Sequence, residues 1–390
     1  MRTAKAIMPL VLVAATAVTG CSFQGDEEAG DGFRIGLVLD QTGVSSQIAN
    51  PTGAGIKAYL EKVNADGGVN GQKIEIAKQS DSRSIAAGAQ TAFQEVLQTD
   101  PVAVLGSVNS LGIAAAVPVV SNAGVPVMIG SAPDTLLEPP EPWLFTQVMP
   151  ASKMVSVSLN YLEDELGGLE GKRLAVSAAA SAYGDGYVKA FEKQASERGF
   201  TSVAVDRPPL TLTTFATNAA KIVSSNADGL LLLSVPAQTP LIVNDLVAAG
   251  FEAPVIGYES ASEPAIIADV ATDQYVTFRG APIPKDGSEL KKAAEDAGFE
   301  DQANSLWFSY GWNQAAIFVE ALGACGEECE SADLLEQLEN VKDFTPPAES
   351  SYGAVTYSED KHFAATTVQF YTWDVAAKAE IQVGQPIAVE

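Results

Sequence analysis

The sequence predicts an α/β protein with two lobes, each built on a parallel β-sheet. From Phe33 onward, short apolar runs alternate with longer stretches of helical periodicity, which is typical of βαβ units. The alternation starts again near Ser152, after a proline-rich stretch, and therefore indicates a second lobe. The length agrees, because 390 residues exceed what one hydrophobic core usually holds, and 47% of them are hydrophobic.

The first lobe is predicted from four apolar runs bounded by turn residues. Each run has the length of a buried strand, and the segments between the runs carry apolar residues at helical spacing. We expect strands at residues 34–39, 73–78, 102–105 and 125–129, and helices at 52–64, 85–98 and 111–122. Five prolines between Pro133 and Pro150 exclude a regular helix there.

The second lobe is predicted from the same alternation. We expect strands at residues 173–178, 202–205, 229–233 and 254–256, and helices at 152–166, 186–198, 213–225 and 239–249. Helical patterns at 289–297, 303–322 and 331–341 follow, with strand runs at 353–357 and 366–373. These late elements are too few for a third sheet, so we expect the chain to return to the first lobe and finally to cross to the second.

The charge argues against nucleic acid as a partner. The net charge is −26 at pH 7, and binding to a phosphate backbone depends on clustered Lys and Arg.

The motifs of common enzyme classes are missing from the sequence. It contains no G-x-S-x-G and no P-loop, and the first expected strand is followed by Asp40-Gln41-Thr42-Gly43 in place of G-x-G-x-x-G. The single histidine, His362, could act as a general base only for a nucleophile, and the sequence contains no nucleophile motif. We therefore expect neither an enzyme nor a bound cofactor.

The N-terminus has the pattern of an export signal. Arg2 and Lys5 precede a mostly apolar stretch at residues 6–18, which is shorter than the run of about 20 that spans a bilayer. Val18-Thr19-Gly20-Cys21 resembles the lipobox of bacterial lipoproteins. We expect residues 1–20 to be a signal peptide, Cys21 to be lipidated, and residues 21–32 to form a flexible tether to the membrane.

The two remaining cysteines, Cys325 and Cys329, lie in a Gly/Glu turn with C-x3-C spacing. Such a pair is compatible with three roles: a redox pair, half of a metal site, or a structural disulfide. There is no second cysteine pair, and His362 lies 33 residues beyond Cys329, so we expect no metal and favour the disulfide, which export also suits.

Several segments, in this order, resemble the type I periplasmic binding proteins of branched-chain amino acid ABC transporters. They are Ile35-Gly36-Leu37-Val38, Asn64-Ala65-Asp66-Gly67-Gly68-Val69-Asn70-Gly71, Val104-Leu105-Gly106, Gly124-Val125-Pro126-Val127, Ala182-Tyr183-Gly184-Asp185-Gly186, Gly250 to Gly257, and Ser350 to Tyr357. The resemblance covers the chain from about Phe33 to its C-terminus.

The resemblance implies two Rossmann-like lobes joined by three hinge strands, in which a small ligand is trapped without chemistry. It divides the chain into an N-terminal lobe of residues 33–147 and 280–350 and a C-terminal lobe of residues 148–279 and 351–390. In such folds the ligand lies at the carboxyl ends of strands, near helix N-termini.

The resemblance also implies ligand-binding residues in the first lobe. Asn109 and Ser110 follow an expected strand, and Ser110 corresponds to the serine that holds a ligand carboxylate; an ordinary helix-capping role is the alternative. Ala132 corresponds to a carbonyl that accepts from the ligand ammonium. Asp134 stands where a threonine is usual, so it either meets a ligand donor or cation or turns away to cap a turn.

In the second lobe, Tyr183 corresponds to the cleft tyrosine and Glu259 to the acid that pairs with the ligand ammonium. Tyr258 and Trp307 are available to line the pocket. Ile48 replaces a usual aromatic residue, and the loop 234–236 lacks the usual tyrosine, so the resemblance implies a more apolar site than a simple aliphatic amino acid needs.

The function expected from the resemblance is that of a lipid-anchored, extracytoplasmic substrate-binding component of an ABC importer. It would close on an amino acid or a related, more apolar or aromatic solute and present it to permease subunits. A ligand-sensing module that acts through a separate signalling partner is the alternative. A secreted hydrolase is disfavoured by the missing nucleophile motif.

Overall fold

The computed structural model describes residues 32–364 and 367–389. The expected signal peptide, nearly all of the expected tether and the lipidation site Cys21 lie outside these residues. In the described part, no helix has the length and apolar character needed to cross a membrane.

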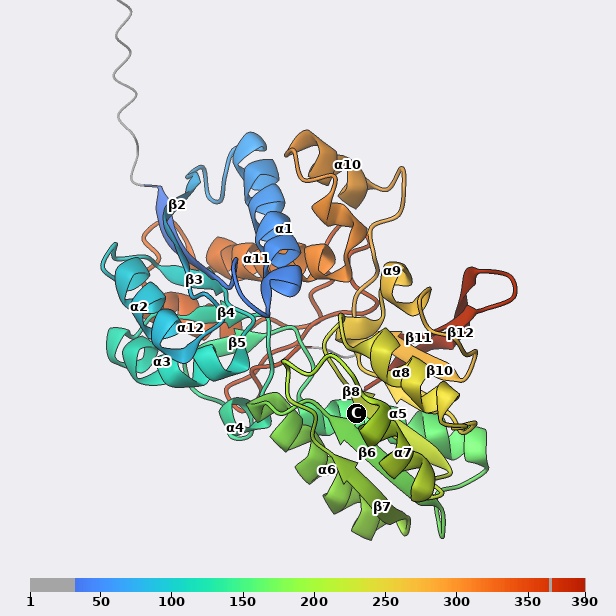
Figure 1. Cartoon of the computed structure of the whole chain (residues 1–390). Coiled ribbons are helices and arrows are strands. Elements are labelled where there is room, and N and C mark those ends of the chain that lie inside the picture. The colour runs from blue at the N-terminus through green and yellow to red at the C-terminus, as the bar shows by residue number, and fades with distance from the viewer. Residues whose placement is uncertain (1–31, 365–366, 390) are drawn as a thin grey trace, which may run out of the picture. The chain divides into compact units, whose positions relative to one another are not determined.

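The first sheet is parallel throughout, with the strand order β2-β1-β3-β4-β5 (Figure 1). Its strands are β1 (Phe33–Leu39), β2 (Ile74–Asp81), β3 (Ala103–Gly106), β4 (Val127–Ile129) and β5 (Leu144–Thr146). Four of them were predicted, whereas β5 was missed because the prolines around it mask its three apolar residues.

The helices of the first lobe come from two distant parts of the chain. They are α1 (Ser46–Ala65), α2 (Ala86–Leu97), α3 (Ser110–Ala123), the one-turn α4 (Asp134–Leu137), α10 (Glu289–Asp296), η2 (Gln302–Asn304), α11 (Leu306–Cys325) and α12 (Ser331–Glu339). The expected return of the chain to this lobe is confirmed by α11, whose residues Ala315 and Phe318 share a hydrophobic core with β1.

The helices α1 and α11 pack with their backbones in close approach (Figure 1). A Cβ atom on Gly55 would lie 2.1 Å from the carbonyl oxygen of Phe308, and one on Gly311 would lie 1.9 Å from that of Thr52. Only glycine fits at such distances. The pair fixes the N-terminal end of α11 and with it Trp307.

The second sheet has the order β12-β11-β10-β9-β8-β6-β7. Its strands are β6 (Arg173–Ala178), β7 (Thr201–Asp206), β8 (Gly229–Leu233), β9 (Val255–Gly257), β10 (Tyr275–Arg279), β11 (Thr367–Asp374) and β12 (Ala379–Ala388). The pairs from β7 to β10 are parallel, whereas β11 pairs antiparallel with both β10 and β12. The predicted parallel core is thus confirmed, and β10 and β12 are additions that the apolar pattern did not reveal.

The helices of the second lobe are α5 (Ala151–Leu166), α6 (Ala182–Arg198), α7 (Ala216–Ser224), α8 (Thr239–Ala248), η1 (Glu259–Ala261) and α9 (Pro264–Ile267). The chain enters this lobe after β5, leaves it after β10 and joins it again at β11.

The segment before β11 differs from its expected place. We expected residues 351–390 to belong to the second lobe and residues 353–357 to form a strand. Val355, Tyr357 and Ala364 instead share the core of the first sheet, and the segment makes isolated bridges to Phe344 and Thr146. Its apolar residues are buried by α12 and β5, so the passage to the second sheet comes at Thr367.

Candidate functional site

A cavity of about 160 Å³ is lined by loops of both lobes. Its first-lobe side consists of Val44, Ser45, Gln47, Ile48, Val108, Asn109, Ser110, Leu111, Gly130, Ser131 and Trp307. Its second-lobe side consists of Ala179, Ser181, Tyr183, Leu210, Leu233, Ser234, Val235, Pro236, Ala237, Tyr258 and Ser260. Most of these residues follow the carboxyl ends of parallel strands, where helix N-termini converge.

The N-terminus of α3 faces this cavity. Asn109 is its N-cap, and its Oδ1 accepts a hydrogen bond from the N–H of Gly112 at 2.9 Å. The loop before it is held by Asp40, a fully buried residue whose Oδ2 accepts from the N–H groups of Val108 at 2.7 Å and Asn109 at 3.1 Å. Burial raises the pKa of Asp40. Asp40 therefore positions Asn109 and Ser110 without lining the cavity.

The N-terminus of α6 lies on the opposite side. Ser181 is its N-cap and accepts from the N–H of Gly184 at 3.0 Å. Arg207 binds the carbonyl oxygens of Ala179 and Ser181 and pairs with Asp185 at 2.7 Å. The turn that carries Ser181 and Tyr183 is thus fixed from outside the cavity.

Two tyrosines form an aromatic wall. The rings of Tyr183 and Tyr258 are tilted, with centroids 5.6 Å apart. The hydroxyl of Tyr183 donates to the carbonyl oxygen of Met149 at 2.9 Å. Burial raises the pKa of both phenols well above the ordinary value, so both are neutral.

Glu259 lies directly between Tyr258 and Ser260, which both line the cavity, but it is fully buried and does not line the cavity itself. Its Oε2 accepts from the hydroxyl of Tyr310 at 2.7 Å and from the N–H of Gly280 at 3.2 Å. Its Oε1 has no hydrogen-bond donor among the described residues. Burial raises the pKa of Glu259 to about 7.

Two of the expected first-lobe residues do not line the cavity. Ala132 is fully buried in the core of the second lobe. Asp134 Oδ1 accepts from the N–H of Ser152 at 3.0 Å and from its hydroxyl at 2.7 Å. Asp134 therefore caps α5, which is the second of the two roles that the sequence left open for it.

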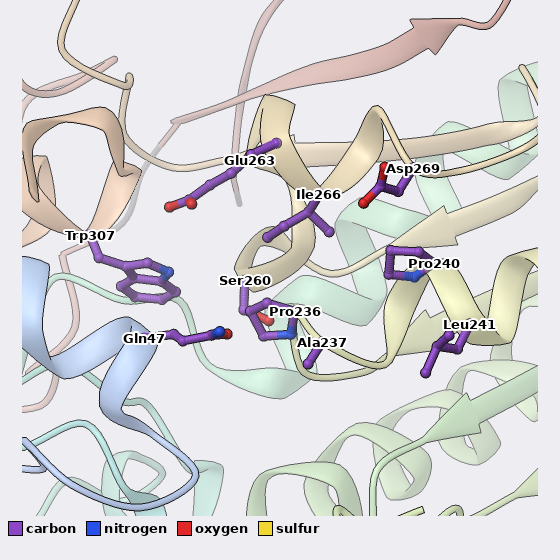
Figure 2. Close-up of a pocket in the computed structure, with 11 residues that line it drawn as sticks. Gln47, Pro236, Ala237, Pro240, Leu241, Ser260, Glu263, Ile266, Asp269 and Trp307 are labelled. Carbon is purple, nitrogen blue, oxygen red and sulfur yellow. The ribbon is translucent and has the colours of Figure 1, made fainter. Parts of the chain in front are cut away.

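Trp307 stands at the N-terminal end of α11, where the hydroxyl of the N-cap Ser305 accepts from its N–H at 3.1 Å. Its side chain lines the cavity, and its Nε1 has no acceptor among the described residues. Figure 2 shows the indole directed into the space between Gln47 and Ser260.

The remaining chemistry of the described residues is structural. No group of three or more His, Cys, Asp and Glu side chains among them could hold a metal ion. Cys325 and Cys329 form a disulfide with an S–S distance of 1.95 Å. His362 is stacked on Phe145 and its Nδ1 lies 3.0 Å from the carbonyl oxygen of Leu144.

The structure therefore brings Asn109, Ser110, Tyr183, Tyr258 and Trp307 to one cavity and places Glu259 beside it. Sequence reasoning missed Ser45, Gln47, Ser181 and Ser260. A serine before the first turn of a helix is a readable capping signal for Ser45 and Ser181. No local sequence pattern indicates that Gln47 and Ser260 line the cavity, because their position there depends on how the two lobes meet.

Comparison with known proteins agrees with the fold. The chain is 25% identical over 344 residues to Leu/Ile/Val-binding protein homolog 3 of Brucella melitensis, covering 87% of this chain and 91% of the relative. It shares its fold with a branched-chain amino acid ABC transporter protein of Thermus thermophilus solved with bound valine, at a TM-score of 0.79 and 18% identity, over 91% of this chain and 96% of the other. A fatty acid ABC transporter substrate-binding protein of Thermomonospora curvata has a TM-score of 0.73 and 19% identity, over 91% and 92% of the chains. The model of the periplasmic binding protein family matches residues 32–379, and the chain belongs to this family, whose members bind substrates and do not convert them.

Proposed function

We propose that the chain is the substrate-binding component of an ABC importer, which closes on an amino acid or a related solute between its lobes. The observation that carries this proposal is the cavity whose lining comes from both lobes. A solute that touches both linings stabilises the closed arrangement, because only that arrangement makes both sets of contacts.

The N-terminus of α3 suits the carboxylate of such a solute. The first N–H groups of a helix have no acceptor within the helix, and their dipoles favour an anion. Asn109 satisfies the N–H of Gly112, which leaves the N–H groups of Ser110 and Leu111 and the hydroxyl of Ser110 for a ligand.

Glu259 suits the amine of the solute. A buried carboxylate oxygen without a donor is costly, and an ammonium or an amide N–H that reached Oε1 would remove the cost. The position of Glu259, between the lining residues Tyr258 and Ser260, supports this role. Ser110 and Glu259 come from different lobes, so both ends of the solute favour closure.

The middle of the cavity suits an apolar group. No charged side chain lines it among the described residues, and Ile48, Leu210, Leu233, Tyr183 and Tyr258 supply apolar surface. Leucine, isoleucine, valine and fatty acids, which appear in the names of similar proteins, combine a carboxylate with an apolar chain. This shared chemistry supports a solute of that kind.

The anchor and the partner belong to the same proposal. Cys21, preceded by the apolar stretch at residues 6–18, would hold the protein at the outer face of the cell membrane by a lipid. There it would deliver its solute to the permease subunits of the importer.

Closure on a solute is the direct test. Small-angle X-ray scattering of residues 22–390 should give a smaller radius of gyration at saturation with the bound solute than without it, and calorimetry of amino acids, amides and aromatic acids identifies that solute. An unchanged scattering profile at saturation contradicts closure. The absence of binding across the whole panel contradicts the amino-acid assignment.

A further inference from the structure

A second cavity, of about 480 Å³, is lined by the residues drawn in Figure 2. The two share the lining residues Gln47, Pro236, Ala237, Ser260 and Trp307, so they are two chambers of one cleft that meet at these side chains. The first chamber has room for one small amino acid, and the second adds further space beside it. A solute confined to the first chamber would leave the second one to water.

The two chambers differ in charge. The first has no charged side chain among the described lining residues, whereas the second has the two carboxylates Glu263 and Asp269 and no cationic lining residue. Both hydrogen bonds of the Glu263 side chain, from the Ser305 hydroxyl and from the Leu306 N–H, are to Oε1, which leaves Oε2 without a donor among the described residues. Arg279, which lies near Glu263, is already paired with Glu380.

The junction between the chambers has an unused donor. Trp307 is 3% exposed, lines both chambers and has no acceptor for Nε1 among the described residues. A buried indole N–H without an acceptor costs free energy that a ligand carbonyl at this point would recover. In Figure 2 the indole projects into the space between Gln47 and Ser260. The junction therefore favours a hydrogen-bond acceptor in the middle of the solute.

We infer that the solute is a dipeptide or another amino acid whose amine carries an acyl group with a terminal ammonium. Its carboxylate and apolar side chain occupy the first chamber, its amide carbonyl accepts from Trp307 Nε1, and its terminal ammonium lies in the second chamber, whose lining includes the carboxylates of Glu263 and Asp269. The amide N–H donates to Glu259 Oε1. This inference rests on the proposed function and names the substrate class for the same cleft.

Three probes of increasing length separate these contacts. L-leucine fills the first chamber only, with its ammonium at Glu259. N-acetyl-L-leucine adds the carbonyl and replaces that ammonium with an amide N–H. Glycyl-L-leucine adds the terminal ammonium to the acylated probe with no other change. Isothermal titration of residues 22–390 should give at least tenfold tighter binding of glycyl-L-leucine than of N-acetyl-L-leucine, and tighter binding of glycyl-L-leucine than of L-leucine.

Variants assign the difference to the residues of the second chamber. The double variant Glu263→Gln/Asp269→Asn should lose the preference for glycyl-L-leucine over N-acetyl-L-leucine while binding the latter as before. Asp269→Asn alone, at an exposed position, should reduce that preference about threefold without risk to the fold. Trp307→Phe keeps an aromatic ring but removes the N–H donor. It should weaken the binding of both acylated probes about tenfold and the binding of L-leucine less. Glu336→Gln, an exposed acid on α12, is the matched control.

The outcomes separate this inference from the proposed function. Binding of L-leucine that is tighter than that of glycyl-L-leucine overturns the inference and leaves the proposed function intact. An unchanged preference in the double variant also overturns it. If none of the three probes binds, the inference is overturned, and the wider panel of amino acids, amides and aromatic acids decides the amino-acid assignment.

Discussion

The hydroxyl of Tyr310 donates to Glu259 Oε2 at 2.7 Å, and the other oxygen of the same carboxylate has no donor among the described residues. Tyr310 belongs to α11, which packs on the first lobe, and Glu259 follows β9 of the second sheet. The hydrogen bond therefore joins the two lobes. It also holds Glu259 beside the cavity with only one of its two carboxylate oxygens hydrogen-bonded. We therefore expect both the stability of the protein and its affinity for an amine to depend on the charge of this acid.

Glu259 should make the fold less stable as pH rises. Its pKa is raised from 4.5 to about 7, chiefly by burial, so the folded state binds a proton that the unfolded state has lost between these values. Its contribution to stability is complete below pH 4.5 and is lost as pH rises through 7, a difference of about 3 kcal/mol. Urea denaturation at pH 5 and pH 8 measures it. Glu259→Gln should show a smaller decline than the parent; an equal decline contradicts the assignment.

Glu259 should also make the binding of an amine dependent on pH. Only the ionised carboxylate pairs with an ammonium, so L-leucine should bind about tenfold more weakly at pH 6 than at pH 8. Glu259→Gln should bind at least 30-fold more weakly at pH 8, since breaking a buried charged pair costs about 2–5 kcal/mol. Titration calorimetry at the two pH values gives both numbers. A variant that binds as the parent does would exclude Glu259 as the amine partner.

Asp134 should stabilise the fold through α5 and leave the ligand unaffected. Asp134→Ala removes the acceptor of the Ser152 N–H and hydroxyl and should lower the free energy of unfolding by about 1–2 kcal/mol. Ser152→Ala removes the hydroxyl partner of Asp134. The double variant should lose less free energy of unfolding than the sum of the losses in the two single variants. Additive losses in urea denaturation, or tighter binding of aliphatic amino acids by Asp134→Thr, would show that Asp134 acts elsewhere.

Asp40 should act on affinity through the loop before α3. Asp40→Ala leaves the buried N–H groups of Val108 and Asn109 without an acceptor and should cost about 2–4 kcal/mol of stability. Because this loop presents Ser110, ligand affinity should fall as well, although Asp40 does not line the cavity. Calorimetry well below the unfolding temperature separates the two effects. Unchanged affinity in the folded variant would show that the loop keeps its shape without Asp40.

Cys21 should determine where the protein is found. If it carries the lipid, Cys21→Ser should move the protein from the membrane fraction into the soluble fraction, since the apolar stretch at residues 6–18 is too short to span a bilayer. Fractionation followed by a carbonate wash checks this. Retention of the variant in the washed membranes would contradict lipid anchoring.

The sequence by itself determined the local elements that carry their own signal. The runs that became β6 and β8 are apolar and bounded by turn residues, so their bounds could be predicted to the residue. Ser110 and Tyr183 could be assigned to the cleft because they correspond to cleft residues of the family that the sequence resembles, and Ser110 also follows an expected strand at the start of a helix.

Only the tertiary structure decided what depends on the meeting of distant segments. Asp134 could cap a turn or face a ligand, and its hydrogen bonds to Ser152 at the start of α5 show that it turns away from the ligand cavity. The edge strand β12 is exposed along most of its length and has no apolar pattern, so it is defined by its pairing with β11. The second chamber exists because Gln47 and Trp307 of one lobe meet Pro236 and Ser260 of the other. Burial and hydrogen-bond partners are properties of packed neighbours, and the sequence around a residue does not contain them.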